Sequence, residues 1–438
     1  MGVYGGVTLV GGSKLVVRSW WLVAGVTLGI ATVSAQGTSI FLSRDHPAIQ
    51  YSTRQTHNAI AKLNESIEKG QVSLEFDSLP RGYLASVLKA FDIPASSQTL
   101  VFSENSLQRD HISKATPRAV YFNDTVSVGW AKGADTIEAT VLDATQGVQF
   151  YTIRQVKQPT PQFARRADCL QCHLLPQTQG VPGVLTMSVL PLSDNQNEYA
   201  QGWEMDHRTP IEDRWGGWYV TGAQVPAKHL GNVPVLHVPT SYVRASTAPV
   251  LPTASGAFDT SAYLTPHSDV VALMVLNHQT HMSNLLTRLG WQARIALHGT
   301  AKAGALPQEV RDTAFEVVDY MLFVDEAPMP SAVRGGSAFT TEFPSKGPRD
   351  KKGRSLRDLD LTRRLLRYPC SYMIYNEAFD ALPPEAKGLV YERLWAILSG
   401  AESKGDYAKL AAPDRRAIIE ILRDTKPGLP PYFTAAQP

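Results

Sequence analysis

Two cysteines and a histidine lie together near the middle of the chain, in the heptapeptide ADCLQCH, as Cys169, Cys172 and His173. The chain has three cysteines in 438 residues, and the third, Cys370, stands far from this pair. Thiols and an imidazole at this spacing could form a disulfide, a zinc or iron–sulfur site, a redox dithiol, or a covalent haem attachment site. Each alternative needs different further residues, so the rest of the sequence helps to choose among them.

Most of these alternatives lack the residues that they need. A structural zinc site takes two further ligands, typically a second close pair of Cys or His, and there is no second CxxC. An iron–sulfur cluster takes four cysteines. A redox dithiol is expected at the start of a helix after a buried strand, and the preceding residues QPTPQFARRAD do not have that pattern. A disulfide remains open, although it leaves the histidine without a role.

Covalent haem attachment uses all three residues of the motif. The two thiols add to the two vinyl groups of haem, and the adjacent histidine becomes the proximal ligand of the iron. We therefore predict one haem c, bound through Cys169 and Cys172, with His173 on the iron. Cys370 lies in the apolar segment LLRYPCSYMIY, so we expect a buried free thiol there.

Several longer segments carry a family resemblance. Besides CLQCH, the segments SLPRGYLASVLKAFDIPASSQTLVFS, AVYFNDTVSVGW and RWGGWYVTG resemble recurring blocks of bacterial periplasmic proteins that have a cytochrome c domain with a single haem-attachment motif. The resemblance covers most of the chain after its first residues. It implies haem c and a redox function, and it does not imply a particular reaction. The chain does not resemble a small soluble cytochrome c, which is far shorter and has its motif near the start.

The first 35 residues have the composition of an export signal. They contain no Asp or Glu, and Lys14 and Arg18 precede the apolar run WWLVAGVTLGIATV and a small-residue cleavage pattern. We predict a signal peptide over residues 1–35, cleaved after Ala35, and a periplasmic or otherwise exported protein. The alternative is an inner-membrane anchor formed by an uncleaved segment 19–35, which is shorter than the ~20 apolar residues that span a bilayer.

The charge balance of the remaining chain excludes some classes of partner. After the predicted cleavage site, basic and acidic side chains are equal in number, whereas nucleic-acid binders usually show a basic excess. The basic run KGPRDKKGRSLRD (346–358) mixes both signs, and we expect a solvated loop. No Ser/His/Asp order, phosphate-binding glycine loop or nucleotide fingerprint is visible. We expect a redox partner protein, no nucleic acid, and membrane contact only through an uncleaved signal.

Hydrophobic periodicity predicts an α+β fold with three regions. Residues 36–160 form an N-terminal α+β region, in which helices at 55–70 and 81–93 cover one face of a small antiparallel sheet between 99 and 155. Residues 161–267 form the haem c-binding region, with strands and long loops. Residues 268–438 are mainly helical, with helices predicted at 268–290, 306–324, 386–399 and 414–424.

The distal ligand of the iron has several candidates. His229 lies in the loop AKHLGN and His207 in EMDHRTPIEDRWGGW, and His281 lies on a predicted helix. Arg208 and Arg214 stand close to His207, and a guanidinium matches the geometry of a carboxylate, so we expect them to contact the haem propionates. Methionines 187 and 205 are weaker candidates, because methionine is more often simple core packing.

One predicted helix carries two histidines on an apolar stripe. Met274, His278, His281, Leu285 and Leu289 are spaced four, three, four and four residues apart, which places them on one face. Both histidines should therefore face inward. They are interpreted as buried hydrogen-bonded groups, as haem contacts or distal ligands, or as part of a separate metal site that would need a further ligand.

The state of the sixth iron position separates two functions. A histidine or methionine there makes an electron carrier, and an open position makes a site that reacts with oxygen, peroxide or other small ligands. The first function is an exported mono-haem c-type cytochrome that transfers electrons in the periplasm, and a single haem favours it. The alternative is a haem-dependent oxidoreductase or small-ligand sensor, which the length of the chain favours. Whether the protein is an enzyme stays open at this stage.

Overall fold

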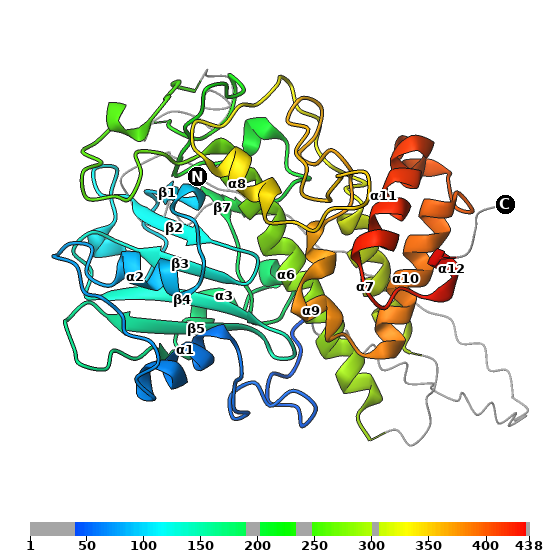
Figure 1. Cartoon of the computed structure of the whole chain (residues 1–438), viewed down its shortest axis with the longest axis horizontal. Helices are drawn as coiled ribbons and strands as arrows, with labels where there is room; N and C mark the ends of the chain where they lie inside the picture. Colours follow the sequence, from blue (N-terminus) through cyan, green and yellow to red (C-terminus); the bar gives the residue numbers. More distant parts are fainter. Residues whose placement is uncertain (1–39, 190–201, 234–247, 300–305, 435–438) are drawn as a thin grey trace, which may run out of the picture. The chain divides into compact units, whose positions relative to one another are not determined.

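An antiparallel sheet forms the centre of the N-terminal half, in a computed structural model that describes residues 40–189, 202–233, 248–299 and 306–434. Within these ranges seven strands pair in the order β6-β5-β4-β3-β2-β1-β9 (Figure 1). They are β1 (Thr99–Val101), β2 (Arg118–Phe122), β3 (Val126–Trp130), β4 (Thr136–Asp143), β5 (Gly147–Arg154), β6 (Ala164–Arg165) and β9 (Trp218–Tyr219). The predicted α+β class and the antiparallel sheet are confirmed.

Short turns fix the register of the central strands. The side chain of Asn123 accepts hydrogen bonds from the backbone amides of Thr125 and Val126, which closes the turn between β2 and β3. Gly147 begins β5 with φ +80°, a conformation that favours glycine, and it pairs with Asp143 across the β4–β5 hairpin. These turn residues give the strands that the sequence predicts.

One face of the sheet packs on α1 (Ala59–Glu68) and α2 (Leu84–Ala90) (Figure 1). Asn58 caps α1 by accepting hydrogen bonds from the amides of Ile60 and Ala61. Both predicted helices exist but are shorter than expected. Their apolar side chains and the alternate residues of β2 to β5 form one buried cluster, as the period of two in each strand requires.

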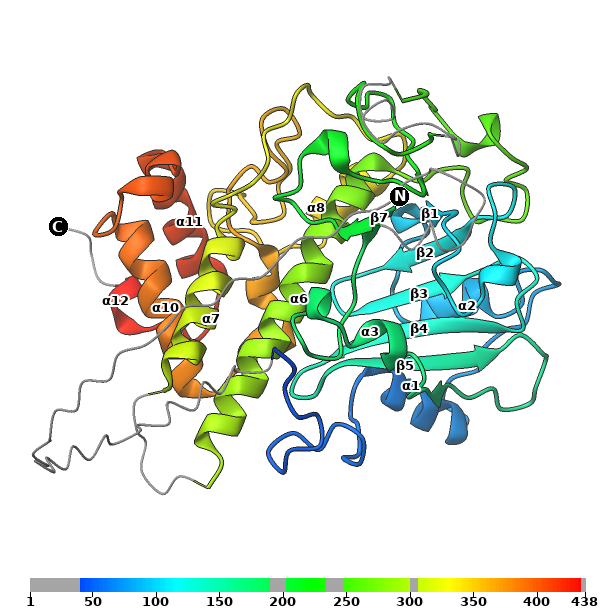
Figure 2. The ribbon, with the colours of Figure 1, turned by 180° about the vertical axis from the view of Figure 1, so that it is seen from behind.

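Helix α6 (Val270–Leu297) crosses one end of the sheet, where it contacts β5 and the β2–β3 and β4–β5 turns (Figure 2). Asp269 caps α6 through the amides of Val271 and Ala272. Most residues of α6 are buried on every side, so the helix is a central element of the core rather than an amphipathic surface helix. The predicted inward stripe, with His278 and His281, is buried as expected.

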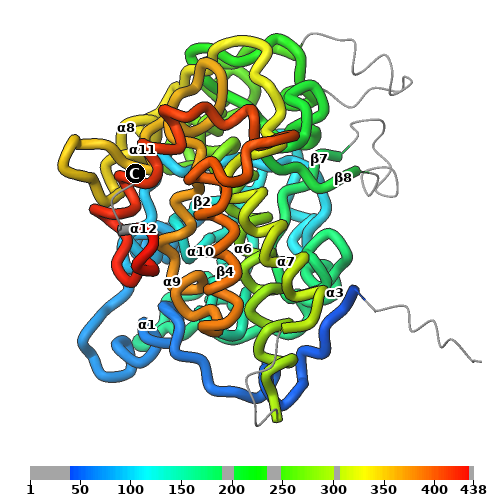
Figure 3. The backbone as a smooth tube through the Cα atoms, turned by 90° about the vertical axis from the view of Figure 1, so that its right-hand side faces the viewer, coloured from blue at the N-terminus to red at the C-terminus, as the bar shows by residue number. Residues whose placement is uncertain are grey.

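The remaining helices form a layer on α6 (Figure 3). They are α7 (Gln308–Met321), α8 (Phe339–Ser345), α9 (Glu377–Asp380), α10 (Pro384–Ser399), α11 (Ala412–Thr425) and α12 (Pro431–Thr434). Proline stands in the first turn of α10 and α11, where its missing amide costs no hydrogen bond. The predicted helical C-terminal region is confirmed.

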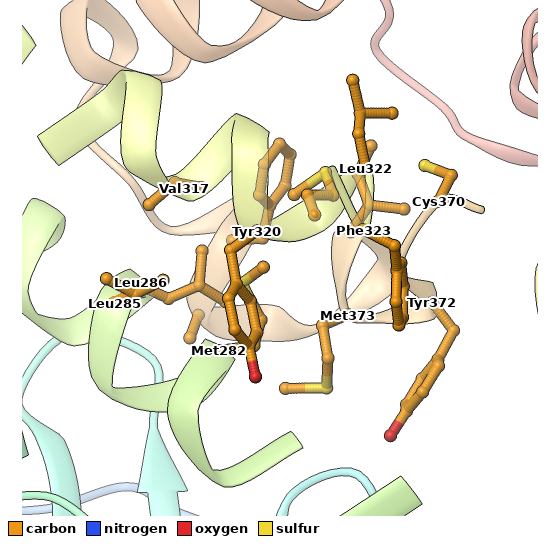
Figure 4. Close-up of a cluster of buried hydrophobic side chains, with 14 of the residues drawn as sticks. Met282, Leu285, Leu286, Val317, Tyr320, Leu322, Phe323, Cys370, Tyr372 and Met373 are labelled. Atoms are coloured by element: carbon orange, nitrogen blue, oxygen red, sulfur yellow. The ribbon is translucent and has the colours of Figure 1, made fainter. Parts of the chain in front are cut away.

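Cys370 is a buried free thiol, as the sequence predicts. Figure 4 shows it in a cluster with side chains such as Leu322 and Met373, and all three belong to the largest buried core. Burial raises the pKa of the Cys370 thiol to about 12, so this group stays protonated and unreactive.

The central region is joined to the sheet and is not a separate layer. Its helix α3 (Leu170–His173) follows β6, and its strands β7 (Met187–Val189) and β8 (Gly202–Glu204) form a hairpin. Strand β9 extends the main sheet beyond β1. The main sheet therefore takes strands from both sides of residue 160, and the predicted regional boundaries stay predictions.

Two expectations about the surface have different outcomes. In the loop 346–358 the lysines are exposed, but Asp350 and Arg357 are buried, so the expectation of a wholly solvated loop was wrong. No helix in the described ranges is long and apolar enough to cross a membrane. The predicted signal peptide, and its alternative as an anchor, lie outside the described residues.

Candidate haem-attachment site

The cysteine motif forms a single helical turn over the face of the sheet near β4 and β5 (Figure 2). The backbone carbonyl of Cys169 accepts a hydrogen bond from the amide of His173 (3.0 Å), which brings the two cysteines and the histidine together. Cys169 is half-buried, Cys172 is exposed, and both thiols are free. The strand that precedes the motif, β6, has two residues, is not buried and lies at the edge of the sheet, so the expectation that no buried strand precedes the motif is confirmed.

The surroundings of Cys169 do not suit a redox dithiol. Burial, together with the charges of Asp168 and Glu138, raises the pKa of this thiol to about 11. A reactive dithiol needs a cysteine whose pKa is lowered by positive charge or by a helix N-terminus. The environment of Cys169 raises the pKa of the thiol instead of lowering it, which disfavours thiol–disulfide exchange at this motif.

The orientation of His173 is set by a backbone carbonyl. Its Nδ1 donates a hydrogen bond to the carbonyl of Gly183 (2.9 Å), and the amide of Gly183 donates to the carbonyl of His173 (2.9 Å). With the proton on Nδ1, the lone pair of the ring is on Nε2, which forms no hydrogen bond to the described residues. The ring packs on Phe150 of β5, with centroids 4.8 Å apart.

This arrangement is the one that metal-bound histidines usually have. Such histidines donate their other ring N–H to a carbonyl or carboxylate, which fixes the tautomer and the ring orientation. Burial lowers the pKa of His173, so the ring is neutral near pH 7, as an iron ligand must be. The residues of the motif therefore fit a haem c with His173 as the proximal ligand.

Asn284 on α6 holds the segment that orients His173. Its Oδ1 accepts a hydrogen bond from the amide of Val184 (3.0 Å), and its Nδ2 donates to the carbonyl of Val184 (2.7 Å). A Cβ at Gly183 would lie 2.3 Å from Asn284 Oδ1, so only glycine permits this close approach. The helix at the centre of the core thus sets the position of the carbonyl that His173 uses.

Replacing Asn284 with alanine should disturb the haem without removing it. We expect a loss of stability of roughly 2 kcal/mol, because both backbone groups of Val184 lose their partner, together with a shift of the haem reduction potential. Asn64→Ala is a matched control, because Asn64 binds the amide and the carbonyl of Phe163 in the same way (2.9 and 2.8 Å). Equal potentials in the two variants would contradict the positioning role of Asn284.

The sheet beside His173 presents a half-exposed polar surface. On the side away from α1 and α2, one row across the strands contains Val120, Gly129, Glu138 and Thr152, and the three side chains of this row are only partly buried. Arg118 Nη2 pairs with Glu138 (2.5 Å), and the charges of both residues act on His173. We did not predict this pair, although strand alternation alone places it on the face opposite the apolar residues.

His207 and His278 form a buried pair. Their Nδ1 atoms are 2.8 Å apart, so one ring donates to the other, and His278 Nε2 is 2.7 Å from the hydroxyl of Ser371. His207 Nε2 is buried without a hydrogen-bond partner. Within the described residues no group of three or more His, Cys, Asp or Glu is placed to hold a metal ion, and a separate metal site at His278 and His281 stays a prediction.

The other distal candidates also have defined surroundings. His281 Nδ1 is 2.8 Å from Glu204 Oε1, on β8, and 4.0 Å from Asp206. The ring of His229 packs on Trp215, with centroids 5.4 Å apart, and its Nδ1 is buried without a partner. The structure thus brings His207, His278 and His281 into one region around α6 and leaves His229 beside Trp215. Distal ligation by any of them stays a prediction.

The two arginines predicted to contact propionates have other partners. Arg208 Nη1 pairs with Glu316 of α7 (2.6 Å). Arg214 is buried and donates to the carbonyls of Thr209 (2.6 Å) and His207 (2.8 Å). Contact of these two arginines with haem propionates stays a prediction. The cations that do act on the motif are Arg118 and Arg166.

The weaker methionine candidates differ from each other. The amide of Trp215 donates to the sulfur of Met205 (3.2 Å), and Met205 is fully buried, so this side chain belongs to the core. Met187 is half-buried on β7, and its carbonyl accepts a hydrogen bond from the indole of Trp218 (2.8 Å).

The buried histidines predict a loss of stability at low pH. Burial lowers the pKa of His278 to about 3 and that of His229 to about 4, from 6.5. Between pH 6.5 and about 4 the unfolded chain binds protons that the folded chain excludes, so the free energy of unfolding falls as the pH is lowered. We expect roughly 1.4 kcal/mol per pH unit for each histidine. Urea unfolding at several pH values measures this slope, and a His278→Asn variant with an unchanged slope would contradict it.

Comparison with protein family models, with curated protein sequences and with solved structures finds no match for this chain. The argument for a function therefore rests on the motif and on the side chains around it.

Proposed function

We propose that the protein is an exported mono-haem c-type cytochrome that transfers electrons in the periplasm. The observation that carries the proposal is the fixed tautomer of His173, whose Nδ1 is bound to the Gly183 carbonyl and whose Nε2 is left for a metal. Cys169 and Cys172 stand on the same turn as free thiols. A disulfide would explain the two cysteines but not the orientation of the histidine.

Each residue of the site has a distinct task in this proposal. Cys169 and Cys172 hold the haem by thioether bonds, and His173 supplies the proximal nitrogen. When bound, the haem supplies a one-electron couple between ferric and ferrous iron. Gly183 and Asn284 keep the imidazole oriented, and this rigidity limits the rearrangement that accompanies a change of charge on the iron.

The exposure of the motif is suited to a protein partner. Cys172 is exposed, and so are Gln171, Arg166 and Ala167. An edge of the haem attached here would be close to the surface, where a redox partner protein can approach it. Arg118 and Glu138 form a paired charge beside the buried side of the motif, so they influence the potential rather than the docking.

Charge changes at this pair should move the reduction potential in opposite directions. A nearby positive charge favours ferrous iron, so Arg118→Gln should lower the potential and Glu138→Gln should raise it. We expect shifts on the order of tens of millivolts, since a charge in a partly buried position contributes on the order of 1 kcal/mol. Potentiometric titration of both variants measures this. Shifts of the same sign, or none, would contradict a haem at this position.

A haem-dependent oxidoreductase or small-ligand sensor is the second candidate. It is favoured by the hydrogen bonds of the predicted distal ligands, because His207 is bound to His278 and His281 is bound to Glu204. A ligand that is already engaged must break such a bond before it can reach iron.

Absorption spectra of the matured protein, ferric and ferrous, with and without carbon monoxide, distinguish the two candidates. A low-spin spectrum that does not change with carbon monoxide supports the electron carrier, because the sixth position is then filled. A high-spin spectrum that changes with carbon monoxide contradicts the carrier and supports the second candidate.

A further inference from the structure

A cavity of 260 Å³ lies away from the cysteine motif, between the turn after β2, α8 and the loop 346–358. On α6, Gln279 lines this cavity, whereas Asn284 faces the segment that orients His173. Gln279 Nε2 donates to the carbonyl of Asn123 (2.6 Å), and its Oε1 accepts from the hydroxyl of Tyr372 (2.9 Å). These two bonds fix the side chain of Gln279 in the wall that α6 contributes to the cavity.

Arg357 supplies a buried positive charge to this cavity. Its side chain is 7% exposed, and Nη2 pairs with Asp124. The guanidinium carbon lies 4.5 Å from the ring centres of both Phe343 and Tyr372. Nε and Nη1 form no hydrogen bond with the described residues, and both atoms remain accessible. Arg357 can therefore donate to a carboxylate in the cavity in addition to Asp124.

Glu342 supplies a negative charge on the wall formed by α8. Its carboxylate accepts a hydrogen bond from the hydroxyl of Ser96 and forms no ion pair with the described residues. The other charges at the cavity, Asp92 and Lys346, pair with each other at the exposed rim (2.6 Å). Glu342 is thus the carboxylate that is left to meet a positive group.

The remaining walls are aromatic. The cavity is lined by Phe122 of β2 and by Phe339 and Phe343 of α8. The ring centroid of Phe339 lies 5.8 Å from that of Phe122 and 5.5 Å from that of Phe343, so the three rings form one apolar surface. Pockets for drug-sized ligands begin at roughly 300 Å³, so this cavity suits a smaller molecule. It combines the Arg357–Asp124 ion pair, the carboxylate of Glu342, which forms no ion pair with the described residues, and an apolar surface, with the Asp92–Lys346 pair at its rim.

We propose that this cavity binds a small zwitterion with an apolar side chain, the chemistry of a free α-amino acid. The ligand carboxylate binds Arg357, its ammonium group binds Glu342, and its side chain packs on the three phenylalanines. The site shares no side chain with the cysteine motif, and its occupation does not require haem.

Isothermal titration of the full-length matured protein tests the proposal with three probes. L-Leucine carries both charges, 4-methylpentanoic acid lacks the ammonium group, and 3-methylbutylamine lacks the carboxylate. We expect binding of leucine and at least tenfold weaker binding of the other two. No binding of leucine, or equal binding of either analogue, would overturn the proposal.

Variants locate the binding within the chain. Glu342→Gln should weaken leucine binding at least tenfold, while Glu385→Gln, an exposed residue at the start of α10, should leave it unchanged. Arg357→Lys keeps the charge and serves as a second test, because complete removal of a buried charge could unfold the chain. Unchanged affinity in both Glu342→Gln and Arg357→Lys would overturn the assignment. The Cys169→Ala/Cys172→Ala protein should bind leucine as well, which separates this proposal from the haem.

Discussion

Replacing Cys169 and Cys172 together with alanine should abolish covalent haem in protein matured in the periplasm. Each thiol forms one thioether bond, so a single replacement leaves a labile one-bond adduct and the double replacement leaves none. The measurement is haem staining after denaturing electrophoresis, in which only covalently held haem stays with the chain. The fold should survive, because Cys172 is exposed and Cys169 is half-buried.

Cys370→Ala is the matched control for this experiment. Cys370 is buried in the helical layer and its thiol stays protonated, so this variant should stain like the original protein. Full staining of the double variant would contradict attachment at the motif. Loss of staining in Cys370→Ala as well would point to a general failure of folding or maturation instead.

Replacing His173 with glycine should leave the haem attached but change its coordination. The thioether bonds do not involve the imidazole, so the attachment survives. The iron loses its proximal nitrogen and should become high-spin, with a large change in the absorption spectrum. Added imidazole should restore the original spectrum, because the space left by the ring between Phe150 and the Gly183 carbonyl can accept it.

His298→Gly is the control for nonspecific effects of losing a histidine. His298 is exposed at the end of α6, and we expect no spectral change there. An unchanged spectrum in His173→Gly would mean that another residue holds the iron. A changed spectrum that imidazole does not restore would show damage to the fold around the motif rather than loss of a ligand.

Local patterns predicted the secondary structure well. The strands β2 to β5 and the helices α6, α7, α10 and α11 follow from apolar periodicity and from turn residues, which act over a few neighbouring positions. Strands β6 and β9 have two residues each, and segments so short have no periodicity that would show which strands they pair with. Their pairing depends on contacts between distant parts of the chain.

The candidate site also combines a local motif with contacts between distant parts of the chain. The cysteine motif is local, so the sequence alone indicates its chemistry. The carbonyl that orients His173 lies ten residues away, and Asn284 lies 100 residues from the Val184 backbone that it holds. The partner of Arg208 is likewise distant, since Glu316 lies on α7 and cannot be identified from the neighbouring sequence.

The buried polar groups of α6 illustrate a further limit. Spacing on a helix predicts that His278 and His281 face inward, and both are buried. It does not predict which groups meet them, because Ser371 and Glu204 come from other elements. Their hydrogen bonds explain how a helix with several polar side chains can lie in the core, since each buried ring nitrogen that bonds in this way avoids a desolvation cost.

The most direct test of the central proposal is intact mass measurement of protein that was matured in the periplasm, followed by peptide mapping. We predict a mass increase equal to one haem per chain, carried by the peptide that contains Cys169 and Cys172. A chain without added mass, or with the two cysteines joined to each other as a disulfide, would contradict the proposal that this protein is a c-type cytochrome.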